Sequence, residues 1–203
     1  NKPESLFMDF GAFDVRAVTV PLYATSSEAQ VHYILEDAQI RYLFVGEQQQ
    51  YDVAFRVMSL SHSLKQIVVF DRDVELDPRD ESTIYMDDFL AMGKACQHQA
   101  EVNKRTAESD TEDLMNILYT SGTTGESKGV MLSHAGYESV MDAHCDRFPG
   151  LGENDVVINF LPFTHVFERA WSCWCLCVGA ELNINLRPQD IQMTIKEVRP
   201  TAM

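Results

Sequence analysis

The sequence predicts an α/β fold in which layers of parallel strands are flanked by helices. Segments with strand-like and helix-like patterns alternate along the whole chain, which is typical of parallel α/β layers. The 203 residues are 45% apolar and 10% aromatic, so the chain can bury one good core or two small ones. This apolar content argues against a disordered chain.

The first part of the chain is predicted to form strands and helices in succession. A β-branched run at 17–20 ends at Pro21, and the capping-box pattern Thr25-Ser26-Ser27-Glu28 opens a helix through about Asp37. Further patterns predict a strand at 42–45, a helix near 52–60 and a strand at 66–70. The acidic segment 73–113 is expected to hold one short helix near 86–97, with its charges on a solvated surface.

The second part of the chain continues this alternation. The apolar run 114–118 predicts a buried strand, and a helical pattern extends from near His134 to about Arg147. We therefore expect the Gly-rich segment between them to be a loop that joins a strand to a helix. Further along, the pattern predicts a strand at 156–160, a helix from about Val166, a strand at 181–184 and a helix after Pro188.

Charge and cysteine content restrict the function. The formal net charge of −15 argues against nucleic acid, whose binding depends on Lys and Arg, and disfavours an anionic membrane surface. Five cysteines without a secretory leader predict free thiols in a reducing cytoplasm. Cys173, Cys175 and Cys177 are interpreted as core residues, because no C-x-x-C pair or second His/Cys cluster accompanies them. No apolar run approaches the roughly 20 residues of a membrane-spanning helix.

The segment 119–130 has the composition needed to bind a polyphosphate. Its glycines let backbone N–H groups approach phosphate, its hydroxyls can donate to phosphate or ligate a metal, and its lysine suits a terminal phosphate. These residues are Thr120, Ser121, Gly122, Thr123, Thr124, Gly125, Lys128 and Gly129. A Walker A loop is excluded because Ser127 precedes the lysine, and the dinucleotide pattern lacks its third glycine. A surface loop without a ligand is the alternative.

A second candidate is His165, at the predicted end of a strand where a helix begins. Ligands of open parallel sheets bind at this edge, and a histidine there can hydrogen-bond a carboxylate or a phosphate. Taken alone, His165 is more typical of a helix start or of packing. The phosphate loop nearby in the sequence favours a role in binding or catalysis.

Three segments carry a resemblance to a known family. Residues 119–130 resemble the signature YTSGTTGxPKGV of the adenylate-forming, or AMP-binding, superfamily, with Ser127 in place of its proline. Residues 161–169 resemble the LPLxHxFER segment of its long-chain fatty-acid–CoA ligase branch, and 20–27 resemble the VPLYPTSS of the same branch. The resemblance implies the fold of part of the large N-terminal domain of an acyl-CoA synthetase.

The resemblance also implies the reaction and the roles of the site residues. Family enzymes use ATP and Mg²⁺ to form an acyl-adenylate, from which coenzyme A displaces AMP to give a thioester. By this resemblance His165 is catalytic and lies near the acyl-adenylate, and Thr123 ligates Mg²⁺. The ATP phosphates would contact Thr120, Ser121, Gly122, Thr123, Thr124, Gly125 and Lys128. Glu168 and Arg169 also belong to the matching segment 161–169. They could have a role in the site, or they could simply pair with each other along their helix.

By the same resemblance, residues 1–203 are part of an N-terminal AMP-binding domain, with 73–113 as a possible connecting segment and no C-terminal domain. The piece alone is expected to be inactive. The implied partners of the parent enzyme are a long-chain fatty acid, ATP and coenzyme A in the cytoplasm, and peripheral membrane contact stays compatible with the sequence. Two alternatives stay open: an adenylating enzyme for another carboxylic acid, and a non-catalytic nucleotide-binding module.

Overall fold

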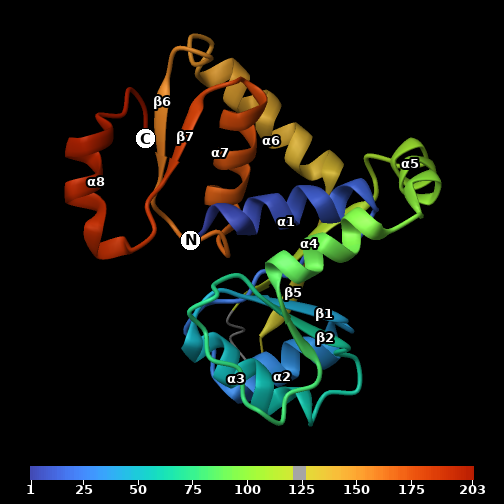
Figure 1. Ribbon diagram of the computed structural model, residues 1–203. Helices are drawn as coiled ribbons and strands as arrows, with labels where there is room; N and C mark the ends of the chain where they lie inside the picture. The colour runs from blue at the N-terminus through green and yellow to red at the C-terminus, as the bar shows by residue number, and fades with distance from the viewer. Residues whose placement is uncertain (121–126) are drawn as a thin grey trace. The chain divides into compact units, whose positions relative to one another are not determined.

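The computed structural model describes residues 1–120 and 127–203, which form two compact units (Figure 1). Unit 1 comprises residues 1–21 and 108–203, and unit 2 comprises residues 22–107. Each unit combines helices with parallel strands, which confirms the predicted α/β class. Unit 2 contains α2 (Glu28–Asp37), β1 (Tyr42–Val45), α3 (Gln48–Met58), β2 (Gln66–Val69), β3 (Thr83–Tyr85), α4 (Met86–Ala95) and α5 (Gln99–Ala107).

Unit 2 is built on a parallel sheet of order β1-β2-β3, with α2 and α3 on one face (Figure 1). Its core joins side chains of these helices to every second residue of β1 and β2, including Leu35, Tyr51 and Ile67. The predicted helix is confirmed as α2, but its capping box lies two residues later than predicted: Ser27 is the N-cap, and its hydroxyl accepts from the Gln30 N–H at 3.3 Å. The helix predicted near 52–60 is α3, which begins four residues earlier, at Gln48. The prediction missed its first turn because the polar residues there show no apolar pattern.

The other face of this sheet is covered by aromatic side chains. The Phe44 ring stacks on that of Phe70, with centroids 6.1 Å apart, and meets Phe89 of α4 edge-on at 5.5 Å. The helix predicted within 73–113 is therefore confirmed as α4. That segment also contains β3, which exists only through its pairing with β2, and α5, which has no buried residue.

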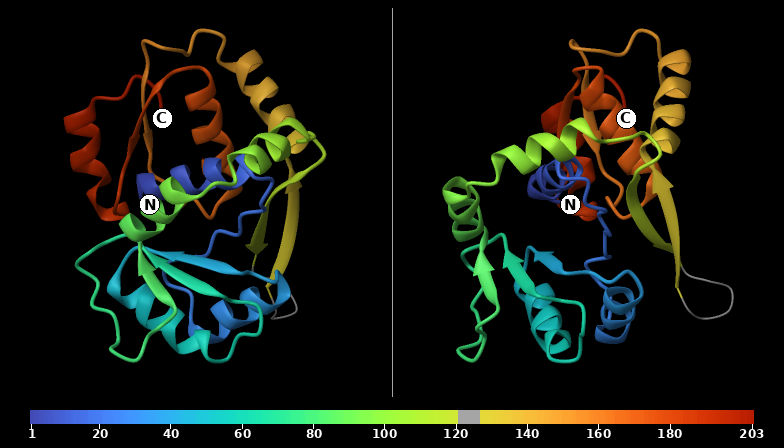
Figure 2. Two further views of the ribbon diagram at one scale, coloured as in Figure 1. Left: turned by 45° about the vertical axis from the view of Figure 1, so that its right-hand side comes forward. Right: turned by 90° about the vertical axis from the view of Figure 1, so that its right-hand side faces the viewer.

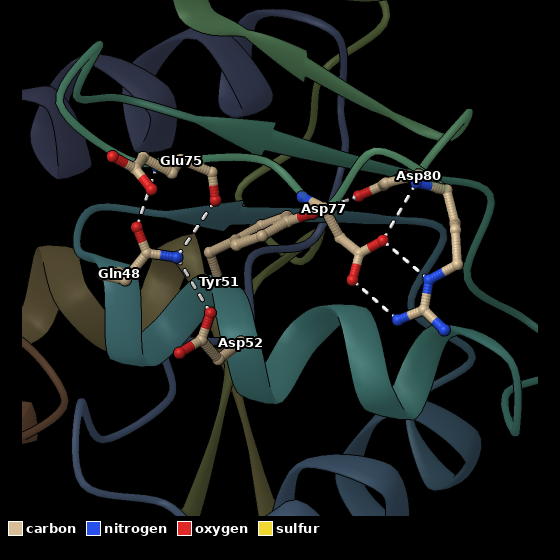
Figure 3. A network of polar contacts seen from close by, with 7 residues as sticks. Gln48, Tyr51, Asp52, Glu75, Asp77 and Asp80 are labelled. Carbon is tan, nitrogen blue, oxygen red and sulfur yellow. Dashed lines mark hydrogen bonds and ion pairs between the residues drawn. The ribbon is translucent and has the colours of Figure 1, made fainter.

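The acidic loop after β2 is held by hydrogen bonds to side chains of α3 (Figure 3). The hydroxyl of Tyr51 donates to Asp80 Oδ2 at 2.8 Å and accepts from the Asp77 N–H at 2.8 Å. Gln48 holds the loop at a second point, through both the N–H and the carbonyl of Glu75. Burial is the main cause that raises the pKa of Tyr51 to about 12. The prediction of a solvated surface is thus corrected for Asp77 and Asp80, which are partly buried and bind protein groups, whereas Asp73, Glu75 and Glu81 are exposed as predicted.

Unit 1 contains the N-terminal helix, an antiparallel strand pair and a parallel strand pair (Figure 2). Its helices α6 and α7 contact each other, and the predicted limits of α6 are confirmed. The elements are α1 (Pro3–Asp14), β4 (Leu114–Thr120), β5 (Lys128–Ser133), α6 (His134–Arg147), β6 (Val156–Asn159), α7 (Val166–Cys177), β7 (Glu181–Ile184), the 3-10 turn η1 (Pro188–Asp190) and α8 (Ile191–Val198).

The parallel strands β6 and β7 and helix α7 enclose the core of the C-terminal part. Trp171 and Trp174 pack there against Val157 and Cys175. Cys173 and Cys175 are buried, as predicted, but Cys177 is exposed near the end of α7. The last residues add a second partner to β6, because Ala202 forms a parallel bridge with Val157.

The strand β5 corrects the prediction that the Gly-rich segment joins a strand directly to a helix. It pairs antiparallel with β4, so the segment connects two strands and α6 follows the second one (Figure 2). Residues 128–131 are all exposed, so their sequence lacks the alternation by which a strand is recognised. Pairing with the apolar strand β4 is what makes them extended. This pair is also the exception to the predicted parallel order.

Candidate functional site

Thr120 and Lys128 lie opposite each other at the end of the β4–β5 pair, as Cα partners on adjacent strands. Both residues are exposed. The structure thus places two residues of the predicted phosphate site, one with a hydroxyl and one with an ammonium group, on adjacent strands, and in kind they fit a polyphosphate. The other predicted residues, Ser121, Gly122, Thr123, Thr124 and Gly125, lie outside the described residues.

Strand β4, which carries Thr120, is held in place on both sides. On one side it pairs with β5. On the other side, the backbone N–H of Thr19 donates to the Met115 carbonyl at 3.2 Å, and the Thr19 carbonyl accepts from the Ile117 N–H at 3.0 Å. Of the predicted strand 17–20, only this single bridge residue is extended against a partner. Inside the unit, the buried Asn116 amide exchanges hydrogen bonds with the hydroxyl of Tyr137. These contacts hold β4 within unit 1, with Thr120 at its end.

His165 is the N-cap residue of α7. The ring Nδ1 of His165 accepts from the backbone N–H of Phe167 at 3.2 Å. The backbone N–H of His165 donates to the Pro162 carbonyl at 2.9 Å. Because Nδ1 is the acceptor, the neutral ring carries its hydrogen on Nε2. The imidazole is exposed and thus presents an Nε2–H donor to solvent.

The turn between β6 and His165 is held by a buried carboxylate. Glu168 is 1% exposed; its Oε1 accepts from Asn159 Nδ2 at 2.6 Å and its Oε2 accepts from the Leu161 N–H at 3.0 Å. Desolvation raises the pKa of Glu168, although these hydrogen bonds oppose the shift. The carboxylate therefore connects the end of β6 to the first turn of α7.

Arg169 contacts the same turn from another direction. It is 5% exposed, and its Nη1 donates to the Phe163 carbonyl at 3.0 Å while its Nη2 donates to Asp9 Oδ2 at 2.5 Å. Burial raises the pKa of Asp9 in spite of the adjacent guanidinium. Glu168 and Arg169 therefore do not pair along the helix, as the sequence had suggested, because each turns toward a different buried partner.

Thr19 connects the two predicted parts of the site. Its backbone pairs with β4, and its hydroxyl accepts from Arg169 Nη2 at 3.4 Å. Sequence reasoning missed this connection, because residues 150 positions apart carry no local pattern. The available signal was the charged pair Glu168-Arg169 directly after the apolar pair Val166-Phe167.

The described residues show neither a metal cluster nor a membrane-spanning helix. In the described parts of the chain, no group of three or more His, Cys, Asp or Glu side chains could hold a metal ion, and the predicted Mg²⁺ ligand Thr123 falls outside them. Likewise, none of the helices in those parts is long and apolar enough to cross a bilayer.

The sequence matches the family described as AMP-binding enzyme over residues 1–203. It is 32% identical to long-chain-fatty-acid–CoA ligase 1 of Homo sapiens over 216 aligned residues, which cover 98% of this chain and 30% of that protein. The chain therefore spans about 30% of the length of this relative.

Solved structures share the fold at lower identity. An anthranilate CoA ligase in complex with anthranoyl-AMP has a TM-score of 0.76 and 22% identity, covering 99% of this chain and 37% of that one. ATP-bound MatB of Rhodopseudomonas palustris has a TM-score of 0.65 and 22% identity, covering 98% of this chain and 36% of that one. With the family match along its whole length, the chain belongs to the AMP-binding enzyme family.

Proposed function

We propose that this chain is part of an ATP-dependent long-chain fatty acid–CoA ligase and forms part of its N-terminal AMP-binding domain. The observation that carries the proposal is the pairing of Thr120 with Lys128 at the base of a segment whose sequence resembles a nucleotide-phosphate loop. The long-chain branch is supported by the similarity to the human ligase and by the residues around His165.

In this proposal the paired strands hold the phosphates of ATP. Lys128 contributes a positive charge and Thr120 a hydroxyl donor, and residues 121–125 add backbone and hydroxyl donors. Magnesium, if held in part by Thr123, would supply further neutralisation of phosphate charge. Lys128, Thr120 and the donors of the segment favour attack of a carboxylate on the α-phosphate, with pyrophosphate as the leaving group.

His165 acts on the acid in this proposal. Its Nδ1 is committed to the Phe167 N–H, so its Nε2–H can donate to an oxygen of the carboxylate or of the adenylate. Such a donor stabilises negative charge on that oxygen as the acyl-adenylate forms. The thiol of coenzyme A then displaces AMP, in a step for which the longer parent enzyme supplies further groups. We place that enzyme in the cytoplasm, on the basis of the free cysteines in this chain.

Binding of ATP to the 203-residue chain tests the phosphate site. We expect isothermal titration calorimetry to detect binding, and Lys128→Ala to weaken it by about tenfold or more, the usual loss for a hydrogen bond to a charged group. Lys196→Ala is the matched control, because Lys196 is an exposed lysine on α8 of the same unit. Equal binding by both variants, or no binding by the unaltered chain, would contradict the phosphate site.

The reaction itself is tested by ATP–pyrophosphate exchange. The parent enzyme is expected to show exchange that depends on a long-chain fatty acid, and the 203-residue chain alone is expected to show none. Exchange that depends instead on an aryl or amino acid would assign another substrate class. Exchange by the isolated chain would show that the piece is a complete adenylating unit.

A further inference from the structure

Two consecutive charged residues in the first turn of α7 are buried, which is unusual without compensation. The carboxylate of Glu168 is surrounded by hydrogen-bond donors: the Asn159 amide, the Ser172 hydroxyl and the backbone N–H groups at the end of β6. The nearest are Asn159 Nδ2 at 2.6 Å and the Leu161 N–H at 3.0 Å. The Asn159 amide and the backbone N–H groups can only donate to this carboxyl, so they favour its ionised form and oppose the effect of burial.

These contacts restrain the short segment that leads to His165. Glu168 holds its beginning at Leu161, and Arg169 holds its middle through the carbonyl of Phe163. At the end of the segment, the backbone N–H of His165 donates to the Pro162 carbonyl. Because Glu168 lies one helical turn after His165, the carboxylate fixes the turn and the helix start relative to each other.

The partner of this carboxylate is itself oriented. Asn159 is fully buried, and its Oδ1 accepts from Asn1 Nδ2 at 2.6 Å, so its Nδ2 is the end that faces Glu168. Its backbone carbonyl accepts from the Asn185 N–H at 2.9 Å, which keeps the end of β6 beside the chain that leaves β7. The network therefore has one consistent direction of donors and acceptors.

We propose that Glu168 is a positioning residue, whose buried carboxylate fixes the turn after β6 and thereby the place and tautomer of His165. The link is the cap itself: His165 Nδ1 accepts from the Phe167 N–H only while the turn keeps the ring over the start of α7. The consequence for catalysis rests on the proposed function, in which the Nε2–H of His165 faces the reacting acid. The positioning itself can be measured without any substrate.

Glu168→Gln is the principal variant, because it keeps the size of the side chain and replaces one acceptor oxygen with an N–H donor group. That group faces either Asn159 Nδ2 or the Leu161 N–H, so one pair of donors is left opposed. Adding Asn159→Asp reverses the pair, since the new carboxylate accepts from the amide at 168 and still accepts from Asn1. Glu138→Gln is the control, because Glu138 is exposed on α6.

The readout is the tautomer of His165, taken from the ¹⁵N chemical shifts of its ring nitrogens in the neutral form and assigned with a His165→Asn variant. We expect the Nε2–H tautomer in the unaltered chain and in Glu138→Gln. Glu168→Gln is expected to lower the ratio of Nε2–H to Nδ1–H by about fivefold, the usual effect of one hydrogen bond. The double variant is expected to restore the ratio.

Thermal unfolding, followed in parallel, separates positioning from stability. An unchanged ratio in folded Glu168→Gln would overturn the proposal. A double variant that regains thermal stability but not the tautomer ratio of His165 would also overturn it. If Glu168→Gln alone does not fold, a double variant that does not fold either would overturn it as well. The proposed function fails through a different result: no ATP binding by the unaltered chain, or equal binding by Lys128→Ala and Lys196→Ala. Neither result affects the tautomer of His165.

Discussion

Asp113 lies directly before β4, where its carboxylate accepts two hydrogen bonds of 2.7 Å from the guanidinium of Arg16. The hydrogen bond from Arg16 is the main cause that lowers the pKa of Asp113 to about 2 from an ordinary 3.8. Because the folded value is the lower one, the stabilisation is complete above the ordinary pKa and is lost as the pH falls through about 2. The pair connects the chain after α1 to the strand that carries Thr120.

Removing the guanidinium should therefore raise this pKa. In Arg16→Gln we expect the pKa of Asp113 to rise above about 2, because the main hydrogen bond that lowers it is lost. It should stay below 3.8, because the Asp110 N–H still donates to the carboxylate. The measurement is a ¹³C NMR titration of the side-chain carboxyls. Arg79→Gln is the control: Asp77 is also held at about 2, but by Arg79, so only Asp77 should respond. A titration of Asp113 that is the same in both variants would refute the assignment.

The β4–β5 pair depends on a close approach of its two strands. A Cβ atom added to Gly129 would lie 2.9 Å from Ile117 Cγ2 and 3.2 Å from the Tyr119 ring. The branched Ile117 side chain has little freedom to move aside, since χ1 of β-branched residues is restricted. Gly129, which the sequence suggested for contact with phosphate, is therefore also needed for packing of the strand pair.

Gly129→Ala is expected to lower the free energy of unfolding by about 1–3 kcal/mol, the usual cost of overpacking. Urea denaturation monitored by circular dichroism measures it. Gly11→Ala is the control: it lies in α1 with no atom within 4 Å of its added Cβ, and alanine favours the helix by about 0.5–1 kcal/mol. A Gly129 variant as stable as the unaltered chain would mean that the strands separate without cost.

Each of the two units has a hydrophobic core of its own. That of unit 2 includes Leu35, Val57 and Ile67, all fully buried, and draws on α2, α3, β1 and β2. Its elements are consecutive in the chain from residue 22 to residue 107. A continuous segment with a complete core is the physical requirement for independent folding.

We therefore expect residues 22–107, produced alone, to unfold in one cooperative thermal transition. Leu35→Ala in this piece should cost about 2–5 kcal/mol, because it removes a fully buried side chain. Leu60→Ala, at a position that is 60% exposed, should change the stability little. Circular dichroism at increasing temperature checks all three. A gradual transition, or equal effects of the two substitutions, would show that this core does not fold as a unit.

Local patterns predicted most elements but not their pairing. The helix at 134–147 and the strands at 42–45 and 181–184 were read from the sequence, because their periodicity and caps lie within a few residues. The exposed strand at 128–133 was missed, since only its partner makes it a strand. The hydrogen bond that Asp80 accepts from Tyr51 was also missed, because the two residues are 29 positions apart in the chain.

The sequence by itself determined the α/β class and the family, because these depend on the alternation of local patterns and on contiguous motifs. The residues that meet phosphate stay a prediction from the same motifs. The tertiary structure alone decided that Thr120 faces Lys128, and that Glu168 and Arg169 turn away from each other to hold the turn before His165. The physical reason is that burial makes a charged side chain bind the donors or acceptors nearest in space. Those groups come from β6, α1 and Thr19, and no local pattern of residues encodes them.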